Sequence, residues 1–437
     1  MGDQTQNSPV SLGRKLGEGK TKILRAIRGH PGRVAVISKD DITGGDGKRH
    51  DVVPGKGEVS NRTTCNVFHF LKRCGVPVAY EGNITPISFA AKLCAQLPIE
   101  AVVRRRHVGS SVERHPYAPK LNVFGQLVFE CFLKTSGKVW KGKRLPCDDP
   151  LMRIEGDFVH LYNPHKPIHG QETFRVIPLS DVLCGHKPKT LDQIKTVALR
   201  TFRLLEKAYA LQNFELIDMK VEFGFYLGDL YLMDVIDAES IRLRRDGQHY
   251  DKQPYREGGL NPDMMSRFRE VLRATEGFHI PRQQLIIWRG SPKDDISRIL
   301  DTLNDPRFPK GALTYADVVQ SMHKRTMQGL LKLAELVQTV PQSVVLDLVG
   351  MSNGAGPTLA GNTHVPVINS PASFSKFPGD VWSSLRTPSE IGCSTVLNPA
   401  NAFLNAIQIL ALTNPLLYEF VRSPLEERLV NVVPFVP

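Results

Sequence analysis

The chain has 437 residues, enough for two or three domains of ordinary size. Its 41% hydrophobic and 23% charged residues are typical of a soluble globular protein. The formal net charge of +12 predicts anionic ligands such as nucleotides. Basic residues form short clusters, such as Arg104–Arg106 and Arg242–Arg245, so the pattern favours phosphate sites and argues against a nucleic-acid-binding arm.

Seven scattered cysteines contain no Cys-x-x-Cys pair, which argues against a disulfide framework or zinc ribbon and predicts a reducing, cytoplasmic location. Residues Met1–Asn7 lack the apolar core of a signal peptide. The longest apolar stretch, Ala402–Phe420, is interrupted by Asn414 and Pro415 among others. It is too interrupted to span a bilayer, so we expect a buried amphipathic helix and no membrane association.

The first part of the chain alternates predicted strands with predicted helices. Apolar residues at helical spacing end at Gly75 in one segment, and a second such segment leads directly into a hairpin. The expected elements are, in chain order, the strand Val34–Ile37, the helix Val59–Arg73, the strands Ile99–Arg104 and Gln126–Phe132, and the helix Leu191–Leu211.

The hairpin is predicted over residues 216–237, with its turn at Gly228-Asp229. Asp218, Lys220 and Glu222 should share one face, because strand side chains repeat every second residue. A lysine between carboxylates suits a polyphosphate with its divalent metal, although a solvated hairpin face is the alternative. An odd-length loop would put Glu222 and Asp234 on the same face, whereas a two-residue loop would separate them.

The last part of the chain has a different pattern. Short apolar strands at Leu285–Gly290 and Ser343–Gly350 end in glycine, and helical segments at 294–303 and 324–338 lie between them. This alternation predicts a parallel, doubly wound sheet with a site at the carboxyl ends of its strands. We therefore predict a first domain over residues 1–260, a helical connector over 261–282 and a second domain over 283–437.

Glycine and lysine are concentrated near the N-terminus, at Gly17-Glu-Gly19-Lys20-Thr21-Lys22. The glycine spacing does not fit a P-loop, and a strand rather than a helix follows. A glycine-rich strand turn with two lysines can still cover nucleotide phosphates, or it can be an exposed hairpin tip. The polar loop 38–47, which contains Asp41, could coordinate metal or be an ordinary turn.

A phosphomonoester site is predicted at the end of the strand that carries Glu100 and Arg104. The loop that follows closes with Gly109-Ser110, which offers backbone amides and a hydroxyl beside the arginine. The alternative is a basic surface strand, which the apolar residues Ala101–Val103 make less favoured.

Three polar turns follow predicted elements of the second domain: Ser291–Asp294, Ser321–Lys324 and Gly350–Pro357. We expect them at one sheet edge, where helix N-terminal amides bind anions. Together they predict a phosphate pocket with His323 as the general acid–base, although a lone histidine can also be a surface or capping residue.

These segments resemble the fused purine-biosynthesis enzymes of animals, which join phosphoribosylaminoimidazole-succinocarboxamide synthetase to aminoimidazole ribonucleotide carboxylase. The resemblance runs from about Leu12 to Tyr418, and 216–224 fits the synthetase signature throughout. The other segments that carry it are 18–22, 38–43 and 251–256 in the first part, and 352–357, 361–363, 380–386 and 392–395 in the second.

For the first domain, the resemblance implies an ATP-grasp-like α+β fold that binds ATP and Mg²⁺. ATP would phosphorylate the carboxylate of carboxyaminoimidazole ribonucleotide, and the amine of L-aspartate would then displace phosphate, with Lys220 in a catalytic role. The nucleotide-binding residues implied are Gly19, Lys20, Lys22 and Lys220, and the metal ligands are Glu222, Asp234 and, through a second metal, Glu100. The substrate-binding residues implied are Asp41, Glu100, Arg104, Ser110, Arg242, Asp251, Lys252 and Arg256.

For the second domain, the resemblance implies a flavodoxin-like α/β fold, with a parallel sheet in a three-layer arrangement that assembles as a homo-octamer. This domain would add CO2 to aminoimidazole ribonucleotide without biotin or ATP. His323 would shuttle the ring proton, with Asp294 also in a catalytic role. The residues implied to frame the ribose phosphate and carboxylate are Ser291, Asp294, Ser352 and Asn353.

The second domain departs from the family pattern at Lys293, Ser297 and Met351. The last two replace a histidine and an arginine near the expected pocket. An active synthetase carried on an impaired carboxylase-like domain that serves oligomerisation is therefore the alternative. A basic nucleic-acid-binding protein is disfavoured, because aromatic residues are only 8% of the chain and lie mostly in apolar runs.

Overall fold

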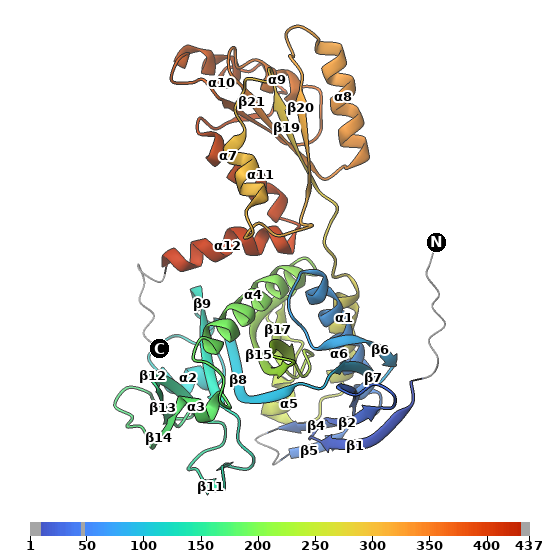
Figure 1. The fold of residues 1–437 in the computed structure, drawn as a ribbon, viewed down its shortest axis with the longest axis vertical. Helices are drawn as coiled ribbons and strands as arrows, with labels where there is room; N and C mark the ends of the chain where they lie inside the picture. The colour runs from blue at the N-terminus through green and yellow to red at the C-terminus, as the bar shows by residue number, and fades with distance from the viewer. Residues whose placement is uncertain (1–9, 45–48, 430–437) are drawn as a thin grey trace. The chain divides into compact units, whose positions relative to one another are not determined.

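A computed structural model describes residues 10–44 and 49–429 and divides the chain into two compact units (Figure 1). Ile280–Leu425 form the second unit, and the described residues on either side of this range belong to the first. Each unit has its own sheets and its own hydrophobic core.

An antiparallel five-stranded sheet opens the first unit, in the order β1-β2-β3-β7-β6. Helix α1 packs on it, and helix α6 packs against α1. The helix expected as a connector is therefore part of the first unit, where Phe268 and Leu272 are buried beside Val59. The elements are β1 Leu12–Glu18, β2 Lys22–Ile27, β3 Arg33–Ser38, α1 Lys56–Arg73, β6 Tyr80–Thr85, β7 Ser88–Lys92 and α6 Met264–Glu276, with the hairpin β4 Asp41–Gly44 and β5 Arg49–Val52 beside them.

A nine-stranded sheet forms the rest of the first unit, in the order β14-β13-β12-β9-β8-β15-β17-β18, with β16 also paired to β15. Helix α4, Thr190–Ala210, packs on β8, β9 and β15 through Ile194, Ala198 and Phe202, which recur every four residues. The strands are β8 Ala95–Arg106, β9 Val123–Leu133, β12 Leu151–Glu155, β13 Phe158–Tyr162, β14 Arg175–Pro178, β15 Glu215–Tyr226, β16 Asp229–Met233, β17 Ile241–Arg245 and β18 Gln248–His249. Short elements complete the unit: α2 Ser110–Arg114, β10 Val139–Trp140, β11 Lys143–Arg144, α3 Leu179–Val182 and α5 Gln253–Gly258.

The predicted hairpin is β15–β16, and its turn lies one residue earlier than expected, at Leu227-Gly228. Both turn residues have positive φ, 51° and 90°, as the tight two-residue turn of a hairpin requires. Glu222 pairs with Met233, so Asp234 immediately follows the partner of Glu222.

All five strands of the second unit are parallel, in the order β20-β19-β21-β22-β23. In chain order this is 2-1-3-4-5, the strand order of flavodoxin-like folds, as expected. The strands are β19 Gln284–Arg289, β20 Thr314–Val319, β21 Ser343–Val349, β22 Val367–Pro371 and β23 Cys393–Thr395. The helices are α7 Ser297–Asn304, α8 Thr326–Thr339, α9 Ala355–Ala360, η1 Pro378–Val381, α10 Trp382–Leu385, α11 Pro399–Ala411 and α12 Pro415–Leu429, of which the residues from Glu426 onward belong to the first unit.

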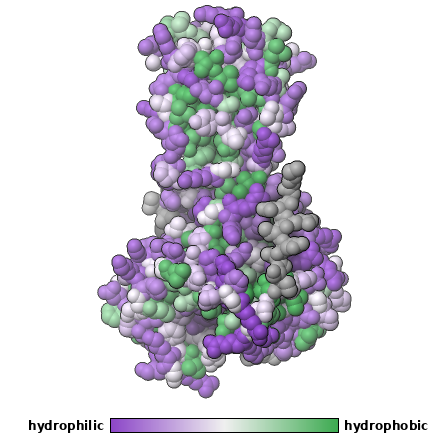
Figure 2. Space-filling view, turned by 45° about the vertical axis from the view of Figure 1, so that its right-hand side comes forward, coloured by the Kyte–Doolittle hydropathy of each residue, from purple (hydrophilic) through white to green (hydrophobic). Residues whose placement is uncertain are grey.

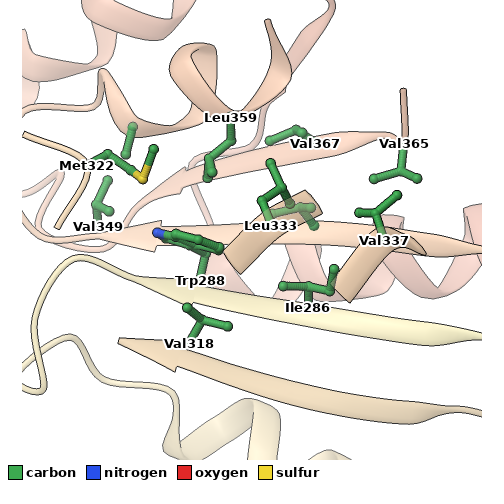
Figure 3. Close-up of a cluster of buried hydrophobic side chains, with 12 residues drawn as sticks. Ile286, Trp288, Val318, Met322, Leu333, Val337, Val349, Leu359, Val365 and Val367 are labelled. Carbon is green, nitrogen blue, oxygen red and sulfur yellow. The ribbon is translucent and has the colours of Figure 1, made fainter. Parts of the chain in front are cut away.

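Helices cover both faces of this sheet. On one face, Leu333 of α8 and Leu359 of α9 pack with the strand residues Ile286 and Trp288 (Figure 3). Helix α11 packs against β21 and β22. Alternate strand residues are buried on both faces, which is why the strands read as continuous apolar runs.

The single helix predicted over Ala402–Phe420 is wrong, because the segment is divided between α11 and α12. The Asn414 side chain accepts hydrogen bonds from the amides of Leu416 and Leu417, and Pro415 follows it at the helix start. An asparagine cap followed by proline begins a new helix. Among the described residues, no helix is long and apolar enough to cross a membrane.

Candidate functional site

In the first unit, Asp218, Lys220 and Glu222 share one face of β15, as predicted. Lys220 Nζ donates to Glu100 Oε1 of the neighbouring strand β8 at 2.7 Å, and Glu100 is the register partner of Glu222. The residues between them, Met219 and Val221, are buried on the other face.

Two side chains hold Glu222 in place. Lys134 Nζ lies 2.6 Å from both carboxylate oxygens of Glu222, and Gln96 also donates to it. Burial opposes ionisation of Glu222, but the ammonium groups of Lys134 and Lys220 outweigh it and lower its pKa. Glu222 is therefore a carboxylate among lysines.

Asp234 also meets this cluster, although a two-residue turn should separate it from Glu222. Asp234 has a φ of 75°, so the backbone leaves strand geometry at this residue and the period-two rule no longer applies. Its carboxylate forms an ion pair with Lys22 of β2. Burial lowers the pKa of Lys22 to about 8, while the charge of Glu222 acts in the opposite direction. Lys22 thus links the two carboxylates.

Asp149 and Lys134 belong to this cluster and were not predicted. Burial, followed by the charge of Glu100, raises the pKa of Asp149 to about 6. Asp149 accepts a hydrogen bond from the amide of Thr135 at 2.7 Å. The pair of adjacent carboxylates Asp148-Asp149, just before strand β12, could have indicated this part of the site in the sequence.

The glycine-rich turn joins β1 to β2 and is closed by a hydrogen bond from the Gly19 amide to the Lys22 carbonyl, 2.9 Å. A strand follows, which agrees with the rejection of a P-loop. Lys20 is exposed on the turn, and its charge contributes to the lowered pKa of Asp148, which burial alone would raise. Lys20 and Asp148 are therefore close enough to interact electrostatically.

Asp41 lies at the start of β4, where His50 Nε2 contacts its carboxylate at 2.7 Å. This hydrogen bond lowers the pKa of Asp41. The ammonium group of Lys39 is 3.5 Å away. Asp41 is thus a carboxylate beside two basic groups.

At the other end of the same sheet face, Arg104 and Arg242 converge on Asp218. Arg104 Nη1 donates to its carboxylate at 2.5 Å, and Arg242 Nη1 donates to the same oxygen. Gly109 has a φ of 59°, and a Cβ there would lie 2.9 Å from a guanidinium nitrogen of Arg242. Only glycine lets this loop pass so close to the arginine, with Ser110 next in the chain.

In the segment 251–256, Asp251 supports the backbone and Arg256 provides a charged side chain. Both carboxylate oxygens of Asp251 accept backbone hydrogen bonds, from Leu243 at 2.9 Å and Gln253 at 2.6 Å. Asp251 is buried, so it fixes the start of α5. Burial, followed by the charge of Arg242, lowers the pKa of Arg256. Two guanidinium groups that repel each other suit an anion between them.

Lys252 is mostly buried and donates to Glu239 Oε2 at 2.8 Å. Burial lowers the pKa of Lys252, and Glu239 opposes this shift. Glu239 also forms an ion pair with Lys56. The structure therefore places Lys252 in an internal ion-pair cluster.

In the second unit, polar turns meet beyond the carboxyl ends of β19 and β21. Asp294 Oδ2 accepts a hydrogen bond from the Ser291 amide at 2.8 Å, and a Cβ at Gly350 would lie 2.7 Å from Asp294 Oδ1. The Nε2 of His323, after β20, lies 3.4 Å from the hydroxyl of Ser352. Strand order reverses at β19 and β21, the place where flavodoxin-like sheets bind ligands.

Ser352 has a φ of 51° although it is not glycine, a strained conformation that its surroundings must impose. Its amide donates to Asp380 Oδ2 at 2.8 Å. Asn353 beside it is buried, and its amide group donates to Ser384 at 2.5 Å. The Asn353 side chain therefore supports the turn, whereas Ser352 is exposed at the site.

The three departures from the family pattern lie on the surface of this edge. Met351 is 67% exposed, and Lys293 is exposed in the turn after β19. Ser297 begins α7, and its amide donates to Asp295 at 2.9 Å.

Behind this site, Asp347 and Asn369 lie side by side on β21 and β22, fully buried. Within the described part of the chain, the side-chain oxygens and nitrogen of this pair make no hydrogen bond of ordinary geometry, although the Gly356 amide lies close enough to Asp347 to oppose the rise in its pKa. Burial, followed by the charge of Asp294, raises the pKa of Asp347 to about 8. No sequence pattern signals this pair, because an isolated aspartate within an apolar run resembles a surface residue.

Each unit thus carries a separate polar site: one of lysines, arginines and carboxylates, and one of hydroxyls, a histidine and a carboxylate at a sheet switch point. These features are typical of an enzyme with two polar sites for small molecules.

Comparison with known proteins gives the particular family. The SAICAR synthetase family matches residues 15–138 and 176–273, and the AIR carboxylase family matches residues 296–428. The chain is 33% identical to a probable multifunctional protein ADE2 of Caenorhabditis elegans over 95% of this chain and 94% of that protein. It is 31% identical, with the same two coverages, to a bifunctional phosphoribosylaminoimidazole carboxylase/phosphoribosylaminoimidazole succinocarboxamide synthetase of Homo sapiens. A solved SAICAR synthetase in complex with ADP is 21% identical, with a TM-score of 0.48, and covers 60% of this chain and 97% of its own.

The chain belongs to this bifunctional family of purine biosynthesis, with a SAICAR synthetase domain followed by an AIR carboxylase domain. The resemblance drawn from the motifs is confirmed.

Proposed function

We propose that the first unit ligates L-aspartate to carboxyaminoimidazole ribonucleotide with ATP, and that the second unit adds CO2 to aminoimidazole ribonucleotide. Family membership along nearly the whole chain supports both reactions. The observation that carries the first is the convergence of Lys22, Lys220, Glu222 and Asp234 from two different sheets.

ATP binds between the five-stranded and nine-stranded sheets of the first unit, in an ATP-grasp-like arrangement. The glycine-rich turn at Gly19 brings Lys20 and Lys22 to the phosphates, and Lys220 meets them from β15. Several phosphate charges packed together need cations on more than one side, which two facing sheets supply.

The carboxylates present fit magnesium. Glu222, Asp234 and Glu100 supply hard oxygen ligands, and each already faces an ammonium group in the structure. Among the described residues, no three acidic, histidine or cysteine side chains lie close enough to hold a metal by themselves. Magnesium bound by one or two carboxylates takes its remaining ligands from substrate phosphates and water. When bound, it neutralises phosphate charge.

The phosphate of carboxyaminoimidazole ribonucleotide binds at Arg104, Ser110 and Arg242, with Glu100 near the imidazole end. Lys252 and Arg256 add positive charge for the anionic substrates, and Asp41 lies near the same face. The substrate carboxylate attacks the γ-phosphorus of ATP, and ADP leaves. The aspartate amine then attacks the acyl carbon, phosphate leaves with the C–O bond electrons, and the proton that the amine nitrogen loses passes to the departing phosphate. Lysine side chains around both carboxylates stabilise the charge that develops.

In the second unit, CO2 forms a bond to the imidazole carbon, and the ring proton on that carbon passes to the His323 imidazole. Ser352 holds the histidine through its hydroxyl, and Ser291 and Asp294 bind the substrate from the turn after β19. No biotin or ATP takes part. The alternative of an impaired scaffold is not favoured, because these groups converge and the family match covers the domain.

We further propose that the protein works in the cytoplasm as a homo-octamer assembled through the second unit. Hydrophobic side chains gather on the face of this unit that Figure 2 presents. Met327 and Leu331, four residues apart on α8, are 66% and 68% exposed. A face that holds large apolar side chains suits another copy of the chain.

Assay of both half-reactions on the full chain tests the proposal. With carboxyaminoimidazole ribonucleotide, aspartate, ATP and magnesium, we expect ADP release that requires all three substrates. With aminoimidazole ribonucleotide and bicarbonate, we expect carboxylation without ATP. Absence of ADP release refutes the synthetase assignment; absence of carboxylation alone restores the scaffold alternative.

A further inference from the structure

Arg114 is a buried arginine that the predicted phosphate site does not include. Its side chain is fully buried, and its guanidinium lies 5.5 Å from the ring centroid of Phe132. Nη2 donates to Glu130 Oε1, and Nη1 donates to the carbonyl of Pro164 at 3.3 Å. These contacts leave the guanidinium little freedom to turn.

The same nitrogen, Nη1 of Arg114, also donates to the hydroxyl oxygen of Ser110 at 2.9 Å. A guanidinium has donors only, whereas a serine hydroxyl has one donor and two acceptor lone pairs. Ser110 must therefore accept this hydrogen bond, and its own proton must point elsewhere. Among the described residues, no group accepts that proton.

Glu130 connects this pair to the rest of the site. Its second oxygen accepts from Arg104 Nε at 2.8 Å, so one buried carboxylate fixes two arginines. Burial opposes ionisation of Glu130, but the charges of Arg104 and Arg114 outweigh it and lower its pKa. With Asp218 and Arg242, the network has three guanidinium groups on two carboxylates. One positive charge is in excess, which suits a phosphate.

We propose that Arg114 is a positioning residue for phosphate recognition: it orients the Ser110 hydroxyl so that this hydroxyl can only donate to the substrate phosphate. The inference rests on the proposed role of Ser110, Arg104 and Arg242 in binding that phosphate. A hydroxyl that is already oriented can donate to a phosphate oxygen at a lower entropic cost. It also has no hydrogen bond to another acceptor that must first be broken. Arg114 itself is covered and does not touch the substrate.

A double-mutant cycle on the full chain tests this. We expect Ser110→Ala to raise the KM for carboxyaminoimidazole ribonucleotide about tenfold, the effect of one charge-assisted hydrogen bond, with the KM for ATP unchanged. Arg114→Lys should raise the same KM. Adding Arg114→Lys to Ser110→Ala should cause little further loss, because the hydroxyl it orients is already gone.

A purely structural role predicts a different result: the Arg114 and Ser110 effects multiply, and the KM for ATP rises as well. That outcome overturns the inference. If Arg114→Lys does not fold, Arg114→Gln serves in the same cycle; it removes the excess positive charge in the presence and in the absence of the Ser110 hydroxyl, so the coupling between the two changes still isolates the hydroxyl. Glu113→Gln, on the exposed side of the same turn, is the matched control. If the wild-type chain releases no ADP, the proposed function itself fails, which separates the two failures.

Discussion

Lys22 and Asp234 form an ion pair that joins the second strand of the N-terminal sheet to the end of β16 in the other sheet. The contact depends on the positive φ of Asp234, which turns its side chain away from the alternation of the hairpin. Glu222 is electrostatically coupled to the same lysine. One lysine thus connects two carboxylates that lie on different strands.

Replacement of Asp234 tests this connection. We expect Asp234→Asn to lower kcat/KM for ATP in the ligation about a hundredfold and to raise the magnesium concentration required, because a charged oxygen ligand is lost. Steady-state ADP release measured against magnesium concentration gives both values. Asp229→Asn, exposed on the same hairpin, is the control and should behave as wild type. Equal effects of the two variants would rule out the proposed role.

Lys220 is held by Glu100 and faces the same cluster. We expect Lys220→Ala to lower kcat for the ligation by at least a hundredfold, because it removes a cation from the site of phosphate transfer. Denaturant unfolding should give Lys220→Ala a free energy of unfolding close to that of the wild type. Lys195→Ala on the exposed side of α4 is the control. Retention of kcat in Lys220→Ala, with only the KM for ATP changed, would limit Lys220 to binding.

His323 and Ser352 are the pair on which the second reaction depends. We expect His323→Ala to abolish carboxylation of aminoimidazole ribonucleotide while leaving ADP release by the first unit near the wild-type rate. The fall should exceed a hundredfold, the usual contribution of a positioned acid–base group. His364→Ala, exposed after α9, is the comparison. If carboxylation persists in His323→Ala, a group other than His323 must accept the ring proton.

Asp347 predicts a pH-dependent stability of the second unit. Its pKa rises from an ordinary value of 3.8 to about 8 on folding, so the folded unit holds a proton that the unfolded chain releases. Stability from this group is fully present below about pH 4 and is lost as the pH rises to about 8, by at most ~1.4 kcal/mol per pH unit.

Asp347→Asn keeps the shape of the neutral acid without the titration. We expect this variant to lose less stability than wild type between pH 5 and pH 8 and to be the more stable protein at pH 8. Denaturant unfolding at several pH values measures this, with Asp301→Asn on the exposed side of α7 as the control. Parallel stability profiles for wild type and Asp347→Asn would show that Asp347 is ionised in the fold.

Local patterns predicted the long helices α1, α4, α6 and α8, the strands around the two sites and the shared face of β15, because alternation and helical spacing are local properties. The parallel, doubly wound sheet of the second unit followed from strand–glycine–helix alternation for the same reason, whereas its 2-1-3-4-5 order is not a local property. The position of the Asp234 side chain could not be predicted from the alternation of side chains along the strand, because the positive φ of this residue interrupts the alternation at the strand end. The apolar runs of β21 and β22 gave no indication of the buried Asp347 and Asn369, and the support role of Asp251 depends on backbone amides that only the folded turn places.

Three residues of the first unit were not predicted from the motifs, because their main contacts come from segments distant in the chain. Lys134 and Asp149 reach the Glu100–Glu222 cluster from the far ends of a loop. Arg114 lies four residues after Ser110 on helix α2, so the spacing alone could have indicated this pair, whereas the contact of Arg114 with Glu130 of β9 depends on the fold. Sequence spacing carries no information on such contacts between elements that are distant in the chain.

Oxygen transfer tests the ligation mechanism most directly. Carboxyaminoimidazole ribonucleotide labelled with ¹⁸O in its carboxylate is converted by the full chain with ATP, magnesium and aspartate, and the released phosphate is analysed by mass spectrometry. An acyl phosphate intermediate predicts one ¹⁸O atom in each phosphate and one in the product amide. Phosphate that is released without label would contradict the account.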